Sequence, residues 1–171
     1  MRIATDRLIV RPFEPADWPE VLGYASDEET MAYMPEGVFD EAAARRFVRD
    51  NEGPEARNFA MELKDGGKLA GHIVFHPWFG DHTYEIGWVT APGLQRLGLA
   101  TEAARAVLRF GFEELKLHRV IATCQPENAP SSRVMEKLGM RREGLFKKCI
   151  PRGGGVWWDE YVYAVLAEEW K

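Results

Sequence analysis

A glycine-bearing turn before a long helical pattern is the first feature of the sequence that could do chemistry. It runs from Gln95 to Thr101, reads QRLGLAT, and precedes apolar residues at helical spacing. The first N–H groups of a helix lack internal partners and carry a partial positive charge, so such a turn can hold a diphosphate. Gly98 permits close backbone approach, and Arg96 could add charge-assisted bonds. We expect Leu97 and Leu99 to point into the core. A simple strand-to-helix turn is the alternative interpretation.

A carboxylate lies in the strand-like run TYEIGWV that leads to this turn. Alternation along a strand places Glu85, Gly87 and Val89 on one face, and Ile86 and Trp88 on the other. A carboxylate in such a position can accept a proton from a nucleophile. Glu85 is therefore a candidate general base, acting directly or through water. Pairing with an arginine, or exposure to solvent, is the alternative.

A second polar pattern, NAPSSRVMEKLGM, follows downstream. Asn128 or a neighbour is expected to cap a short helix that Gly139 ends. Helix capping alone would account for the asparagine and the serines.

Taken together, these stretches and their spacing resemble the GNAT (general N-acetyltransferase) superfamily. Further segments extend the resemblance over nearly the whole chain: TDRLIVRPF, EIGW, EKLGM and DEYVYAVLAEEW. They resemble the corresponding segments of one branch of the superfamily, the ribosomal-protein N-terminal (Rim-type) acetyltransferases. The resemblance implies that QxxGxA forms the pyrophosphate loop for coenzyme A. It assigns acetyl-CoA binding to Val89, Gln95, Arg96, Leu97, Gly98, Leu99, Ala100, Thr101 and Asn128.

The resemblance also implies roles in the transfer step. A backbone N–H near Val89 would hold the acetyl carbonyl, and Pro92 would help to end regular strand pairing. Ser131 would lie near the sulfur, beside the cofactor contact of Asn128. Many members have a tyrosine as acid where this chain has Met135, so a hydrogen bond from Ser131 would assist thiolate departure. With a thiol pKa near 8.5, that departure costs only about 2 kcal/mol at neutral pH. Glu85 and Ser131 are the predicted catalytic residues.

Two stretches are candidates for acceptor binding. Tyr33 and Met34 belong to ASDEETMAYMPEGVF, which in the resembling family borders the acceptor cleft, and an acidic, aromatic rim would suit a cationic amine. Trp157 could line the acceptor groove or a dimer seam, and Asp159 could hold an amine. A solvated helix face and ordinary core aromatic residues are the plainer interpretations.

The expected acceptor is a peptide or protein N-terminal α-amine. Its pKa near 8 asks only for a modest base, whereas deprotonating a lysine near 10.4 at pH 7 costs roughly 4 to 5 kcal/mol. The alternatives are a small amine, such as a polyamine, amino acid or aminoglycoside, and a non-catalytic module that binds coenzyme A. Another acyl group, such as succinyl, also fits the sequence.

The elements that must position these residues are predicted in the order β-αα-βββ-α-β-α-ββ. Asp40 is the expected N-cap of EAAARRFVRDN, a long helix is expected from about Gly98 to Lys116, and PRGGG joins a closing pair of strands. The order predicts an α/β (α+β) fold with a mixed, mostly antiparallel central sheet flanked by helices. The length predicts a single domain over residues 1–171, which the resemblance implies is an acyl-CoA N-acyltransferase domain.

Composition and charge limit the classes of partner and the cellular location that we expect. The net charge of −5 argues against nucleic acid, no apolar stretch approaches a membrane span, and the charged N-terminal stretch argues against export, so a cytoplasmic location is expected. His72 and His76 would lie roughly 13 Å apart along a strand, too far to share a metal, and no metal is expected. Cys124 and Cys149 are predicted to be reduced core thiols. A homodimer is the default expectation.

Overall fold

The computed structural model describes residues 1–171, which divide into two compact units. Unit 1 comprises Met1–His76 and Gly87–Val107, and unit 2 comprises Pro77–Ile86 and Leu108–Lys171. The expectation of one domain over residues 1–171 stays a prediction.

The order of elements agrees with the order expected from the sequence. It is β1 (Ile3–Ala4), β2 (Leu8–Arg11), the 3-10 helix η1 (Pro15–Asp17), α1 (Trp18–Ala25), α2 (Glu28–Met31), α3 (Glu41–Arg49), β3 (Asn58–Leu63), β4 (Leu69–Pro77), β5 (Thr83–Thr90), α4 (Leu99–Glu113), β6 (Arg119–Cys124), α5 (Ala129–Lys137), β7 (Arg141–Pro151) and β8 (Trp157–Leu166). The strands hydrogen-bond in the order β1-β2-β3-β4-β5-β6-β8-β7, with β5 and β6 parallel. The predicted mixed, mostly antiparallel sheet with helices is confirmed; the short strand β1 and the four-residue helix α2 are additions to the predicted order.

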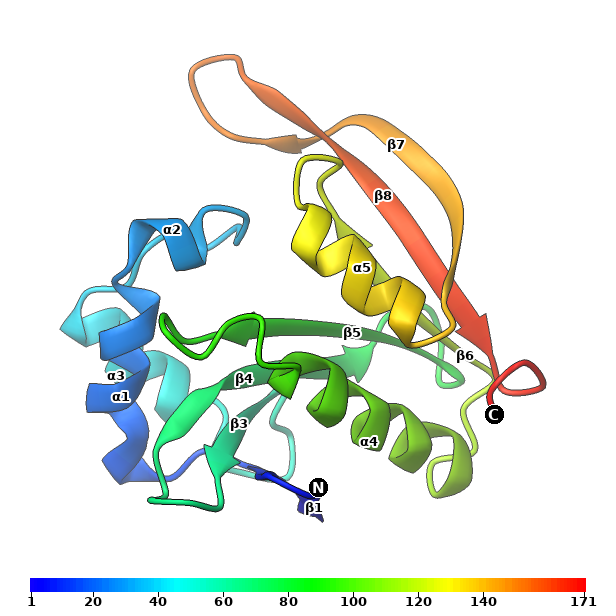
Figure 1. Ribbon diagram of the computed structural model, residues 1–171. Helices are drawn as coiled ribbons and strands as arrows, with labels where there is room; N and C mark the ends of the chain where they lie inside the picture. The colour runs from blue at the N-terminus through cyan, green and yellow to red at the C-terminus, as the bar shows by residue number, and fades with distance from the viewer. The chain divides into compact units, whose positions relative to one another are not determined.

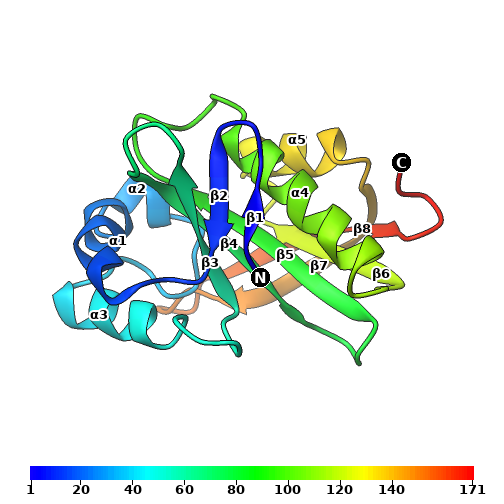
Figure 2. The same cartoon turned by 90° about the horizontal axis from the view of Figure 1, so that it is seen from below.

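Unit 1 is built on antiparallel ladders that join β1 to β2, β2 to β3 and β3 to β4 (Figure 2). Helix α3 begins where the sequence predicted, because the Asp40 carboxylate accepts a hydrogen bond of 2.7 Å from the Ala43 N–H. Helices and strands share one apolar core, which contains Phe13, Val21, Tyr24, Ala25, Met31, Ala44, Val48, Ala60, Leu69, Val89 and Ala91. This core holds strands β3 and β4 together with Val89 of β5.

A histidine lies inside this unit. His72 is 2% exposed, and its Nδ1 shares a hydrogen bond of 2.9 Å with the Tyr24 hydroxyl. Burial lowers the pKa of His72 to about 3 and raises the pKa of Tyr24, because each charged form would lose its hydration. His72 is therefore a neutral hydrogen-bonding group of the core at physiological pH.

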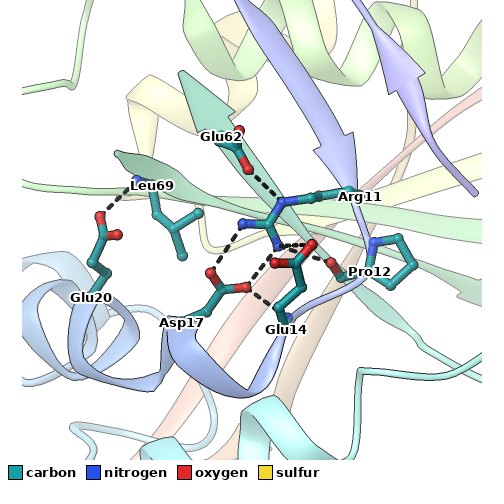
Figure 3. A network of polar contacts seen from close by, with 7 residues as sticks. All are labelled: Arg11, Pro12, Glu14, Asp17, Glu20, Glu62 and Leu69. Atoms are coloured by element: carbon teal, nitrogen blue, oxygen red, sulfur yellow. Dashed lines mark hydrogen bonds and ion pairs between the residues drawn. The ribbon is translucent and has the colours of Figure 1, made fainter. Parts of the chain in front are cut away.

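A buried ion network ties β2 to the first helical turn (Figure 3). Arg11, 4% exposed, donates to both carboxylate oxygens of Asp17 at 2.7 and 3.0 Å, and to Glu62 on β3. The nearby Glu20 carboxylate accepts a hydrogen bond of 2.7 Å from the Leu69 N–H on β4. Since a bidentate arginine pair satisfies a buried charge well, the network orients η1 and α1 on the sheet.

Unit 2 places Glu85 on a defined face of its strands. In the parallel β5–β6 pair Glu85 lies opposite Ile121, and two residues further along β6 Thr123 lies opposite Val162 of β8. Side chains of paired residues point to the same face, and successive residues alternate. Glu85, Thr123 and Val162 therefore share one face.

The other face of strands β6 and β8 packs against helix α5. Cys124 lies opposite Tyr161, and Ala122 lies opposite Tyr163, whose hydroxyl donates to Glu136 of α5 at 3.4 Å. Figure 1 shows α5 lying alongside β6 and β8. Helix α5 and Glu85 therefore belong to opposite faces.

The two cysteines have different surroundings. Cys124 is 3% exposed, as predicted, and burial, with a smaller contribution from Glu160, raises the pKa of its thiol to about 11. The prediction of a core position for Cys149 is wrong, because this thiol is exposed. It lies where β7 shifts register between Phe146 and Ile150, next to the left-handed Lys148 (φ 48°), which breaks the alternation assumed from the sequence.

Candidate active site

The turn before α4 contains two residues with left-handed backbone. Arg96 (φ 62°) and Gly98 (φ 81°) are left-handed, α4 begins at Leu99, and the Glu102 N–H donates to the Gly98 carbonyl at 3.0 Å. Leu99 is buried as predicted, but the expectation that Leu97 points into the core is wrong, since Leu97 is 54% exposed. A left-handed residue on each side of Leu97 rotates it away from the core.

The left-handed backbone of Arg96 is conformationally strained. An L-residue in this conformation costs roughly 1–2 kcal/mol, so the loop needs contacts that hold it. One comes from Gln95, whose side-chain amide donates to the Thr90 carbonyl at 3.4 Å. Another comes from the start of the chain, where the Arg7 guanidinium donates to the Leu97 carbonyl at 2.9 Å.

Arg7 belongs to a cluster around the first turn of α4. Its Nε donates to Glu102 at 2.7 Å, and its backbone N–H donates to the other Glu102 oxygen at 2.8 Å. Thr5 donates its hydroxyl to that second oxygen at 2.6 Å. Burial alone would raise the pKa of Glu102, but the hydrogen bonds from Thr5 and Arg7 together lower it. Sequence reasoning missed these residues, although the acidic Glu102 in the first turn of a predicted helix indicated a possible partner for a nearby cation or N–H group.

A glycine on β4 sets the position of Val89. Gly71 has φ 131°, and a Cβ built on it would lie 2.0 Å from the Val89 carbonyl oxygen and 3.0 Å from the Thr90 Cα. One step further, the Ala91 N–H donates to the Ala70 carbonyl at 2.9 Å. The β4 backbone thus approaches Val89 more closely than any side chain would permit. Gly71 is a further residue that sequence reasoning missed.

The predicted general base has a hydrogen-bond donor beside it. The Thr123 hydroxyl donates to Glu85 Oε1 at 3.4 Å, and both side chains are half-buried. The sequence did not say which group contacts Glu85; in the structure, one such group is the neutral hydroxyl of Thr123 on β6.

Asn128 and Ser131 lie at the start of α5, as expected. Asn128 is its N-cap, and its side-chain oxygen accepts a hydrogen bond of 3.3 Å from the Ser131 N–H. Met135, in the place of the expected tyrosine, is 1% exposed and forms part of the core. The cap uses the Asn128 oxygen, so a contact with a cofactor would use its amide nitrogen.

The predicted acceptor residues divide between the units. In unit 1, Tyr33 and Met34 follow α2 and are half-buried, and Met34 packs against the apolar core. In unit 2, Trp157 is 52% exposed, and Asp159 accepts hydrogen bonds from the Lys147 ammonium at 2.7 Å and the Lys148 N–H at 2.9 Å. The lysine ammonium, its nearest donor, lowers the pKa of Asp159. A role in acceptor binding stays a prediction for all four candidates.

Comparison with known proteins decides the family. Residues 7–141 match the sequence model described as "Acetyltransferase (GNAT) domain". The chain belongs to the GNAT acetyltransferases. It is an acyl-CoA-dependent N-acetyltransferase, as the resemblance implied.

Relatives of this GNAT enzyme extend over its full length. It is 59% identical to the uncharacterized N-acetyltransferase YnaD of Bacillus subtilis (strain 168), with 99% of each chain covered. The crystal structure of an acetyltransferase (GNAT family) from Bacillus anthracis is also 59% identical, with a TM-score of 0.95 over 99% of this chain and 100% of that one. The [Ribosomal protein uS5]-alanine N-acetyltransferase of Escherichia coli (strain K12) is 25% identical, over 99% of this chain and 93% of the relative.

Two further observations concern ions and membranes. No group of three or more His, Cys, Asp or Glu side chains is arranged to hold a metal ion. No helix combines the length and apolar character needed to cross a bilayer.

Proposed function

We propose that this GNAT enzyme acetylates the α-amine of a peptide or protein N-terminus, with acetyl-CoA as donor and Glu85 as general base. The observation that carries the proposal is the hydrogen bond from Thr123 to the Glu85 carboxylate. An α-amine of pKa near 8 asks only for a modest base such as a carboxylate, whereas a lysine near 10.4 asks for a stronger one.

The loop from Gln95 to Thr101 would hold the diphosphate of acetyl-CoA, which supplies the thioester when bound. Three features support the fit: the left-handed Gly98, which has no side chain to block approach to its backbone; the first N–H groups of α4, which have no partner within the helix; and the exposed Arg96 side chain. The amide nitrogen of Asn128 would add a donor from α5.

The transfer asks three things of the protein. Glu85 takes a proton from the attacking amine, directly or through water, while the amine nitrogen bonds to the acetyl carbon. The backbone N–H of Val89 donates to the carbonyl oxygen as negative charge develops there. The Ser131 hydroxyl donates to the departing sulfur, which needs little help because its pKa as a thiol is near 8.5.

The choice of acceptor has support from a relative as well as from chemistry. The uS5-alanine N-acetyltransferase of Escherichia coli is related along nearly the whole chain, and its name states an acceptor with an alanine. We extend that chemistry, the peptide α-amine, to this enzyme. Small amines and a non-catalytic role are the other outcomes that an acceptor survey would detect.

The survey measures thiol release from acetyl-CoA with three sets of acceptors: peptides with free α-amines, the same peptides blocked at the N-terminus but with a free lysine, and polyamines or aminoglycosides. Turnover with the first set and not the second supports the proposal. Turnover with the third set alone would reassign the enzyme to small amines. Saturable binding of acetyl-CoA without turnover on any set would indicate a binding module.

The role of Glu85 has a separate test. Glu85→Gln should lower kcat by about 100-fold or more, with the largest loss at low pH, where the amine is protonated. Glu113→Gln, an exposed carboxylate at the end of α4, is the matched control and should leave the rate unchanged. A pH profile of Glu85→Gln that parallels the wild type would remove Glu85 as base.

A further inference from the structure

The start of the chain reaches the proposed cofactor loop through one side chain. Arg7 lies 95 residues before Glu102 and 90 before Leu97, and its guanidinium contacts both. Nε donates to the Glu102 carboxylate at 2.7 Å, and Nη1 donates to the Leu97 carbonyl at 2.9 Å. One planar group therefore joins the last carbonyl of the loop before Gly98 to the first turn of α4.

The anchor of this arginine is itself fixed. The Arg7 N–H donates to Glu102 at 2.8 Å, and its carbonyl accepts from the Lys64 N–H of the β3–β4 turn at 2.9 Å. Thr5 holds the same Glu102 oxygen at 2.6 Å. The guanidinium thus projects from a backbone that is hydrogen-bonded on both sides.

The geometry next to Gly98 links the arginine to the loop's function. A Cβ at Gly98 would lie 3.6 Å from Arg7 Nη2, the nearest heavy atom to that position. The bond to the Leu97 carbonyl fixes the peptide unit between Leu97 and Gly98, and so the direction of the Gly98 N–H. In the proposed function, that N–H is among the donors to the diphosphate.

We infer that Arg7 is a positioning residue for the cofactor loop: it holds the Leu97–Gly98 peptide so that the loop amides are already directed at the diphosphate before acetyl-CoA binds. Glu102 and Thr5 act through Arg7 by fixing the guanidinium. This inference rests on the proposed role of the loop. It requires no contact between Arg7 and the donor molecule, because preorganised donors bind an anion without the entropic cost of ordering them.

The test compares Arg7→Gln with Arg49→Gln, an exposed arginine of α3 that has only an adjacent ion pair with Asp50. Coenzyme A is titrated calorimetrically into each, hydrogen exchange is followed at residues 95–101, and thermal unfolding is recorded. We expect Arg7→Gln to weaken the Kd about tenfold and to speed exchange in the loop, with a Tm within a few degrees of wild type. Arg49→Gln should match the wild type in all three.

Arg7→Lys separates bonding from charge. A lysine keeps the positive charge but cannot reach two acceptors with one planar fork, so it should recover only part of the affinity. Full recovery by Arg7→Lys, or an Arg7→Gln Kd within twofold of wild type, overturns the inference. Faster exchange at every core amide, with a matching fall in Tm, also overturns it, because the role would then be structural. If the wild-type enzyme fails to bind coenzyme A at all, the proposed function of the loop is refuted first.

Discussion

Gly71→Ala tests whether the close approach of β4 to Val89 is required. The added Cβ would lie 2.0 Å from the Val89 carbonyl oxygen, while real Cβ atoms essentially never approach another heavy atom within 3.0 Å. Relief therefore requires a backbone shift of roughly 1 Å. Overpacking of this kind costs about 1–3 kcal/mol, and a non-glycine residue at φ 131° adds about 1–3 kcal/mol.

The combined loss of about 2–6 kcal/mol should lower the Tm by roughly 4–24 °C, given about 2–4 °C per kcal/mol for a chain of this size. Because Val89 is the proposed donor to the acetyl carbonyl, a shift of about 1 Å should also reduce kcat by up to about 100-fold. Urea unfolding and thiol release from acetyl-CoA measure the two effects.

Gly87→Ala is the matched control for stability. Its Cβ would meet Val74 at 3.4 Å, an ordinary contact, and the position has no positive φ. Both substitutions remove the same backbone freedom from the unfolded chain, so their difference isolates the contact with Val89 together with the strain of φ 131°. If Gly71→Ala unfolds at the same urea concentration as Gly87→Ala, the argument for close approach is refuted.

Three further predictions concern stability. His72→Gln should remove a pH dependence of the free energy of unfolding, because the pKa of this histidine is near 6.5 in the unfolded chain and about 3 when buried. As the pH falls from 6.5 to 5, the unfolded chain takes up the proton and the wild type loses about 2 kcal/mol of stability. The urea midpoints at these two pH values should therefore converge in the variant. Arg11→Met should cost about 3–5 kcal/mol because it leaves the Asp17 and Glu62 carboxylates uncompensated (Figure 3). Arg49→Met, which breaks an exposed pair, should cost less than about 1 kcal/mol, and equal urea midpoints for the two variants would contradict this. Gly23→Ala, on an exposed position of α1 with nothing within 4 Å of the new Cβ, should raise stability by about 0.5–1 kcal/mol, and an earlier melt would argue against it.

Features encoded by adjacent residues were predictable from the sequence. The Asp40 cap, the left-handed Gly139 that ends α5, and the strand RVIATC depend on local capping and alternation. The long helix was expected to reach Lys116 but ends at Glu113, since Lys116 is itself left-handed (φ 53°). Strand β1 was missed because two residues carry no periodic signal and exist as a strand only by pairing with β2.

The loop before α4 was predictable in its position and less so in its geometry. A turn at Gly98 followed by a helix was expected from the sequence, but the outward turn of Leu97 depends on a left-handed arginine that composition does not signal. The contact between Arg7 and Glu102 spans 95 residues, and the approach of Gly71 to Val89 depends on how two strands meet. Contacts of both kinds are set by the tertiary fold.

The long sequence span of the Arg7–Glu102 contact also bears on kinetics. Closing such a large loop costs chain entropy before the contact contributes any favourable energy, and contacts of this kind tend to form late in folding. Helix α4 can gain its hydrogen bonds locally and early, while its amino end stays without the arginine until β2 docks on β3. During refolding, recovery of helical circular dichroism should therefore precede recovery of ligand affinity.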